Sequence, residues 1–131
     1  MKLSKNNKQS IIENNIQKSE QAIKDAEILL KNKSLTASFN RIYYSVFYIL
    51  SALAVTYNFR TTKHTQLIGW FNKNFVKEHK VERKIGKFVQ LAFDQRMESD
   101  YDIFSEFSFE ETEQALVNAK EVFKVIRNLI T

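Results

Sequence analysis

Two arginines interrupt predicted apolar helix faces, where their guanidinium groups could bind an anion. Arg96 continues a stripe with helical spacing whose earlier members are all apolar, namely Val81, Ile85, Phe88, Val89, Ala92 and Phe93. Arg41 lies within a second apolar helix. Because an unpaired charge on a buried face is strongly destabilising, a carboxylate, a phosphate or a partner chain must hold each guanidinium. We therefore predict a polar, anion-binding seam inside a helical bundle.

Three further side chains belong to this predicted seam. Tyr44 shares a hydroxyl-rich helix face with Arg41, and Asp100 and Tyr101 follow Arg96 by about one turn. Asp100 could pair with Arg96, which would make Arg96 a structural residue, and such a pair is worth only about 0.2–0.5 kcal/mol when exposed. Tyr101 could donate to a nucleotide, or it could pack as a ring whose hydroxyl bonds within the protein. A carboxylate from Asp94, Asp100 or Asp102 could equally satisfy Arg41.

His64 starts a predicted helix and offers a general base. A helix N-terminus lowers the pKa of histidine, which suits a neutral base. The alternative, which we favour, is a side chain that hydrogen-bonds locally at the helix start. With only His79 besides it and no cysteine, the chain lacks the ligands of a typical zinc site. We read the acidic cluster near Arg96 as counter-charge, and predict no metal and no cofactor.

The composition predicts one all-α domain. The 131 residues include no proline and only two glycines, so the turn residues of β-sheets and the glycine-rich loops that bind phosphates are missing. No cysteine is present, which excludes disulfides and agrees with a cytoplasmic location. We expect residues 1–9 to form a flexible basic tail and residues 10–131 to form a single domain. The tail has no apolar segment typical of a secretory signal.

Apolar periodicity and capping residues predict five helices in an up-and-down bundle. Their expected bounds are about 9–32, 34–57, 64–77, 81–100 and 108–130. Ser34 and the Thr61–Thr62 pair are plausible N-caps of the second and third helices. Ser108 and Glu111 match a capping box for the fifth. We expect the connector before it to fold its apolar residues, Ile103, Phe104 and Phe107, onto the core.

The charges are distributed unevenly along the chain. The net charge is +5, and residues 60–87 carry eight basic and two acidic residues, whereas residues 94–113 carry eight acidic residues and one arginine. The basic block could face nucleic acid or an acidic partner. We favour a solvated surface, because no aromatic residues interleave with the lysines.

Residues 42–59 carry no charge and approach the length of a membrane span. They contain several hydroxyl-bearing side chains and lack the sustained leucine-rich character of a span. We therefore interpret them as a central bundle helix, buried on most sides, and predict no membrane association. Such a helix either lies at the centre of the bundle or pairs with a second subunit.

Three segments resemble signatures of the HEPN domain family. Residues 37–48, ASFNRIYYSVFY, are similar to the central-helix signature, and residues 63–71, KHTQLIGWF, resemble a second block. Residues 93–102, FDQRMESDYD, resemble the arginine-to-Asp-Tyr block of small prokaryotic members. The resemblance extends over roughly residues 34–130.

The resemblance implies a five-helix bundle that forms a homodimer in a prokaryote. It also implies a partner, because such proteins are often encoded beside a minimal nucleotidyltransferase and many of these pairs act as toxin and antitoxin. Toxin members are metal-independent ribonucleases in which four to six residues separate an arginine from a following histidine. Their histidine moves protons and their arginine stabilises the phosphorane.

This chain departs from the family's catalytic pattern. The positions that would hold the histidine after Arg96 are Tyr101, Asp102 and Ile103. We therefore favour a non-catalytic module that binds a nucleotide, RNA or a nucleotidyltransferase through Arg41, Tyr44, Arg96, Asp100 and Tyr101. A ribonuclease that uses Arg96 with Tyr101 or His64 is one alternative, and a purely structural helical dimer is another.

Overall fold

Helices account for nearly all of the described chain. The computed structural model describes residues 5–101 and 107–130, and of residues 98–101 it describes the backbone alone. Its elements are α1 (Lys5–Lys31), α2 (Leu35–Thr56), α3 (His64–Phe71), the π-helical segment η1 (Asn72–Val76), α4 (Arg83–Tyr101) and α5 (Phe109–Ile130). No strand occurs in these two ranges. The predicted all-α class with five helices is confirmed.

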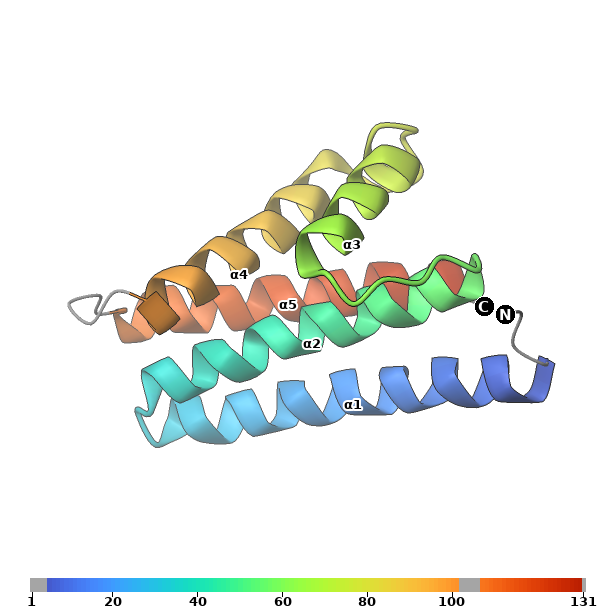
Figure 1. Ribbon diagram of the computed structural model, residues 1–131. Coiled ribbons are helices and arrows are strands. Elements are labelled where there is room, and N and C mark those ends of the chain that lie inside the picture. The colour runs from blue at the N-terminus through green and yellow to red at the C-terminus, as the bar shows by residue number, and fades with distance from the viewer. Residues whose placement is uncertain (1–4, 102–106, 131) are drawn as a thin grey trace.

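The central element is α2, which contacts α1, α3, α4 and α5. Figure 1 shows that α1 and α4 run in the direction opposite to α2 and α5. It also shows α2 between α1 on one side and α4 and α5 on the other. Residues 58–63 cross α2 before α3 begins, and α3 with η1 forms a hairpin against α4. The predicted central position of residues 42–59 is thus confirmed for α2.

Small residues bring α1 and α2 close together. Ser19, Ala22 and Ala26 are buried on α1. The Ser19 hydroxyl donates to the Ser45 carbonyl at 2.6 Å, and the Ser38 hydroxyl of α2 donates to the Ala26 carbonyl at 2.9 Å. These hydrogen bonds satisfy buried hydroxyl groups and fix the rotation of α2 about its axis. That rotation decides which α2 side chains face the core and which face outward.

The predicted core faces are confirmed. The inner face of α2 is buried throughout, and so are the inward residues predicted for the third helix. These residues are Phe39, Ile42, Val46, Leu50 and Leu53 on α2, and Leu67, Ile68, Phe71 and Phe75 on the third helix. On α4, Phe88 and Phe93 are half-buried and the other stripe residues are buried. Phe107 packs on Phe39 with ring centroids 4.1 Å apart, as expected, whereas Ile103 and Phe104 lie outside the described residues.

Helix starts differ from expectation at three places. Helix α1 begins at Lys5, so residues 5–8, expected in the tail, are helical. Ser34 precedes α2, but its side chain makes no capping hydrogen bond with the described residues. Lys63 is the N-cap of α3, and Thr61 accepts from the Lys63 N–H at 3.1 Å. Ser108 does cap α5, because its hydroxyl accepts from the Glu111 N–H at 3.0 Å.

The third predicted helix changes its hydrogen-bonding pattern midway. An α-helix was expected over 64–77, but residues 72–76 are π-helical. At this point α4 approaches closely through Gly86, whose missing Cβ would lie 2.9 Å from Val76 Cγ2 and 3.2 Å from Asn72 Oδ1. Apolar periodicity did not reveal the π-helix, because Phe71 and Phe75 are buried in the structure, as α-helical spacing also predicts.

The described helices include none that is long and apolar enough to cross a membrane. The side chains of the basic block between residues 60 and 87 are all exposed. Lys84 pairs with Glu121 at 2.8 Å, and this contact raises the pKa of Lys84.

Candidate functional site

An aromatic cluster lies on the side of α2 that faces α3 and α4. Tyr43 is buried, and its neighbours Tyr44, Phe47 and Tyr48 are half-buried. The rings of Tyr43 and Tyr44 meet edge to face with centroids 5.4 Å apart, and those of Tyr44 and Tyr48 lie 5.8 Å apart. The spacing of four residues between Tyr44 and Tyr48 places these two rings on the same side of the helix.

Arg96 of α4 lies against two of these rings. Its guanidinium carbon is 4.8 Å from the Tyr43 ring centroid and 5.4 Å from that of Tyr44. Nη2 also donates to the Tyr44 hydroxyl at a long distance of 3.4 Å. Arg96 is half-buried and points toward the Arg41 helix, as its place in the apolar stripe predicts.

Arg41 lies against the same tyrosine. Its guanidinium carbon is 5.1 Å from the Tyr44 ring centroid, so this ring contacts both arginines. Nε and Nη2 of Arg41 donate to the Asn40 Oδ1 at 3.2 and 2.9 Å. We expected a carboxylate partner such as Asp94, but Asp94 instead accepts from Gln90. Among the described side chains, Arg41 therefore contacts a neutral amide and a ring, whereas the side chains of Asp100 and Asp102, the other expected partners, lie outside the described residues.

His64 joins this group from the start of α3. Its Nδ1 hydrogen-bonds with the Tyr43 hydroxyl, and its ring centroid lies 4.0 Å from that of Phe47. The favoured expectation of a local bond at the helix start is therefore wrong, since Tyr43 lies 21 residues earlier in the chain. His79, by contrast, is exposed in a left-handed turn with φ of 58°.

Burial and the Arg96 charge shift the titration of this group. Burial raises the pKa of Tyr43 to about 12, although the Arg96 guanidinium opposes the increase. Burial lowers the pKa of His64, and the Arg96 charge lowers it further. At neutral pH, Tyr43 is therefore a neutral hydroxyl and His64 a neutral imidazole. Arg96 supplies positive charge beside both.

We refer to Arg41, Tyr43, Tyr44, Phe47, His64 and Arg96 as the arginine–aromatic cluster. Tyr43 and Phe47 were not predicted as site residues. The signal for them was present, because both are aromatic neighbours of Tyr44 on one helix, but their partner His64 is distant in sequence. The side chains of Asp100 and Tyr101 lie outside the described residues, although both belong to α4. The described residues contain no group of three or more potential ligands that could hold a metal ion.

The cluster has the chemistry of an anion site with ring surfaces. Guanidinium groups bind phosphate through paired, charge-assisted hydrogen bonds. Half-buried tyrosine rings present faces on which a base can stack. Two arginines around one tyrosine combine both properties.

Comparison with known proteins identifies the family. The HEPN domain matches residues 12–129. This chain belongs to the HEPN domain family. The HEPN resemblance expected from the three sequence blocks is thus confirmed, and the match covers α1 beyond its first residues as well as the later helices.

Three relatives are similar to this chain over most of their length. A UPF0332 protein of Thermotoga maritima is 36% identical over 95% of this chain and 95% of its own. A candidate toxin of Methanocaldococcus jannaschii is 27% identical over 91% of this chain and 85% of its own. A second candidate toxin of that organism is 29% identical over 82% of this chain and 79% of its own.

Proposed function

We propose that this HEPN protein is a toxin-like module that binds RNA through the arginine–aromatic cluster without cleaving it. The observation that carries the proposal is the Tyr44 ring in contact with both Arg41 and Arg96. The names of two relatives support a toxin-like role. Because RNA is the expected ligand, we place the protein in the cytoplasm.

In this proposal, the two guanidinium groups bind a phosphate and Tyr44 stacks on the adjacent base. The surrounding rings lower the local dielectric constant, which strengthens the attraction between phosphate and guanidinium. The half-burial of Arg96 and Arg41 limits side-chain motion before binding, so less conformational entropy is lost on binding. The missing histidine after Arg96 favours binding without cleavage.

Replacing Arg96 by methionine tests RNA binding. Methionine keeps much of the packing volume but removes the charge and the donors. We expect the dissociation constant of a short single-stranded RNA to rise about 10–100-fold, because a charged hydrogen bond is worth about 1.5–3 kcal/mol. Fluorescence anisotropy measures this change.

Arg83→Met is the matched control for Arg96→Met. It removes the same charge from an exposed position on the same helix. Equal losses in the two variants would show that net charge alone drives binding and would contradict the site. An Arg96→Met variant that folds well and keeps full binding would favour a purely structural role.

A second candidate function is an endoribonuclease, favoured by the contact between His64 and Tyr43 beside Arg96. If His64 donates Nδ1–H to the Tyr43 hydroxyl, Nε2 carries a lone pair that can accept the ribose 2′-hydroxyl proton. Arg96 would then stabilise the charge that develops on the phosphorane. His64 thus offers the base that the positions after Arg96 lack.

Expression in cells separates the two functions. Cleavage by this site predicts growth arrest and RNA fragments that disappear in both His64→Ala and Arg96→Ala. Binding without cleavage predicts intact RNA and a loss of binding in Arg96→Ala. Fragments that persist in His64→Ala would exclude His64 as the base.

We also propose that the protein forms a homodimer. Exposed apolar side chains on α4 and α5, namely Leu91, Met97 and Val117, support this proposal, because a second copy of the chain could cover them. Sedimentation velocity at micromolar concentration tests the proposal. A species with the 15.5 kDa mass of one chain at every concentration would contradict it.

A minimal nucleotidyltransferase is the proposed protein partner. The toxin names of two relatives favour a paired system in which a second protein neutralises the first. Co-purification of the adjacent gene's product with this chain would support the pairing. Growth arrest that the adjacent gene does not relieve would count against it.

A further inference from the structure

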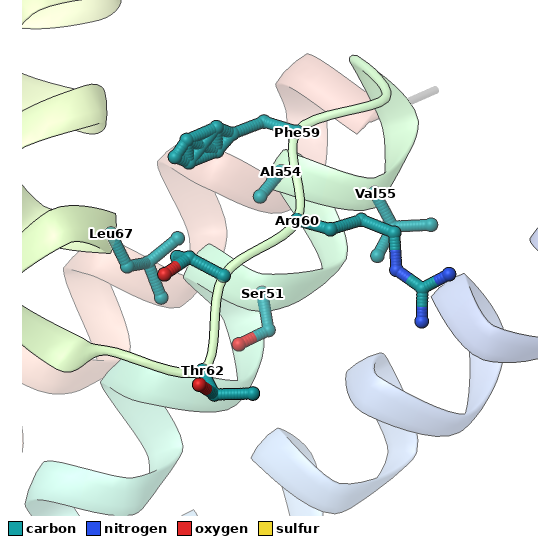
Figure 2. A pocket seen from close by; sticks show the side chains of 8 residues that line it. Ser51, Ala54, Val55, Phe59, Arg60, Thr62 and Leu67 are labelled. Carbon is teal, nitrogen blue, oxygen red and sulfur yellow. The ribbon is translucent and has the colours of Figure 1, made fainter. Parts of the chain in front are cut away.

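A pocket of about 350 Å³ lies where residues 58–63 cross α2 (Figure 2). Its lining combines apolar side chains with three hydroxyl-bearing residues and one arginine: Ser51, Ala54, Val55, Phe59, Arg60, Thr61, Thr62 and Leu67. Ligand pockets typically measure about 300–1,000 Å³ and have apolar walls with a few polar groups. The pocket therefore has the size and composition of a site for one small, partly polar group.

The pocket is continuous with the arginine–aromatic cluster along one face of α2. Tyr44, Tyr48, Ser51 and Val55 recur at helical spacing, and all four are half-buried. Tyr44 belongs to the cluster, whereas Ser51 and Val55 line the pocket. Val55 lies eleven positions after Tyr44, which corresponds to about 16 Å along the helix axis. We call this strip the outer face of α2.

Basic groups lie beside the outer face of α2 at both of its ends and at its middle. Arg41 and Arg96 lie at Tyr44, and Lys18 of α1 holds its Nζ 5.6 Å from the Tyr48 ring centroid. Arg60 lines the pocket, and Figure 2 shows its side chain extending from the loop toward α1. The chain has no acidic residue between Glu27 and Glu78, so α2, the loop and α3 contain none. This pattern is complementary to a polyanion.

We propose that the pocket at Ser51 and Arg60 is a second nucleotide subsite, joined to the arginine–aromatic cluster along the outer face of α2. The inference rests on the proposed RNA-binding function and adds the length and direction of the bound strand. A single strand would stack bases on Tyr44 and Tyr48, place phosphates near Lys18 and Arg60, and insert a nucleoside into the pocket. At about 3.4 Å for each stacked nucleotide, 16 Å accommodates no more than about five nucleotides.

RNA fits this strip better than an acidic protein segment does. Protein interfaces are built around a well-packed apolar or aromatic core from which lysine is depleted. Here cations lie against the rings of both Tyr44 and Tyr48, and the far end is a small pocket. Aromatic rings interleaved with basic groups are instead typical of surfaces that bind single strands.

The length dependence of RNA binding tests the second subsite. A dinucleotide reaches the cluster alone, whereas a uridine hexamer reaches the pocket as well. We expect the hexamer to bind the native protein at least tenfold more tightly than the dinucleotide. Ser51→Leu should fill part of the pocket and reduce that advantage to less than threefold, while dinucleotide binding stays unchanged.

Two matched pairs of variants control this experiment. Within the described residues, the Ser51 hydroxyl donates only to the Phe47 carbonyl of its own helix, so its loss should leave the fold intact. Ser10→Leu makes the same change at an exposed position on α1. Arg60→Glu, in the exposed loop, should weaken hexamer binding at least tenfold, whereas Arg83→Glu on α4 should weaken it by less than threefold.

The outcomes distinguish this inference from the proposed function. If Arg96→Met abolishes binding but hexamer and dinucleotide bind equally, the cluster binds RNA and the second subsite is wrong. If Arg83→Glu weakens hexamer binding as much as Arg60→Glu does, charge alone explains the length dependence of binding. The proposal of a second subsite is then overturned as well. If neither RNA binds the native protein, both proposals fail. Preferential binding of an acidic peptide would assign the strip to a protein partner and overturn the inference.

Discussion

The Tyr44 ring contacts two guanidinium groups, and these contacts explain how two arginines occupy a largely apolar region. Each cation–π contact contributes about 0.5–2 kcal/mol, depending on how far the cation is desolvated. The negative faces of the rings thus provide part of the electrostatic stabilisation that was expected from a carboxylate. A ring carries no net charge, so contact with a ring does not neutralise the positive charge of a guanidinium group.

At the residue scale, His64 makes stability depend on pH. Its pKa in the folded protein is lowered from the ordinary value of 6.5, so the unfolded chain binds this proton more tightly. The contribution of His64 is therefore complete above pH 6.5 and is lost as the pH falls through that value toward the folded pKa. The free energy of unfolding, measured with urea, should be lower at about pH 5.5 than at about pH 7.5.

His64→Asn should weaken this pH dependence, and His79→Asn is its matched control. Asparagine tolerates the left-handed conformation at residue 79. The control should therefore unfold like the native protein at both pH values. If His64→Asn loses as much stability in acid as the native protein does, another group causes the pH dependence of stability.

At the scale of elements, α2 positions nearly every functional group. Its inner face is anchored by the core, and buried hydroxyl bonds to α1 fix its rotation. Its outer side therefore presents Tyr44 and Tyr48 at defined angles to α4 and α1. The hairpin of α3, η1 and α4 then brings His64 and Arg96 to the same place.

The packing of this hairpin depends on Gly86. A Cβ at this position would lie 2.9 Å from Val76 Cγ2 and 3.3 Å from Val76 Cγ1. Overpacking of this kind costs about 1–3 kcal/mol, whereas the helix propensity of alanine recovers about 1 kcal/mol. Gly86→Ala should therefore lower the free energy of unfolding by up to about 2 kcal/mol.

Gly69→Ala provides the contrast to Gly86→Ala. Nothing lies within 4 Å of a Cβ added at this exposed position in α3. Alanine should raise the free energy of unfolding by about 0.5–1 kcal/mol. Thermal denaturation of both variants measures the difference. Equal effects would mean that Val76 moves aside without cost.

At the scale of the whole molecule, the exposed basic residues of α4 can steer RNA without forming the site. Arg83 and Lys87 lie on α4 about 20 Å or less along the helix axis from Arg96. The net charge of +5 and the uneven charge distribution favour faster encounter with a polyanion. Such steering is screened over roughly 10 Å at an ionic strength of about 0.1 M.

Neutralising Arg83 and Lys87 together tests this steering. We expect Arg83→Gln with Lys87→Gln to lower the association rate constant for RNA a few-fold at about 50 mM salt and hardly at about 300 mM. The dissociation rate constant should stay the same. Stopped-flow fluorescence measures both constants. A faster dissociation would show that these side chains contact the bound RNA directly.

The sequence by itself determined the all-α class, the inward faces of the helices and the inward position of Arg96. Periodicity is a local property, and it survives in α2 and α4 because burial of apolar side chains dominates folding. The capping role of Ser108 was also visible, since the Glu111 N–H that it binds lies three residues away. The same reasoning failed at Ser34, whose backbone does not orient the side chain for capping.

Only the tertiary structure decided which groups meet. The Tyr43–His64 bond and the contacts of Arg96 with Tyr43 and Tyr44 join residues from three helices. The π-helical segment at residues 72–76 likewise packs against α4 at Gly86. Such contacts depend on the rotation and separation of packed helices, and no local pattern in the chain encodes either quantity.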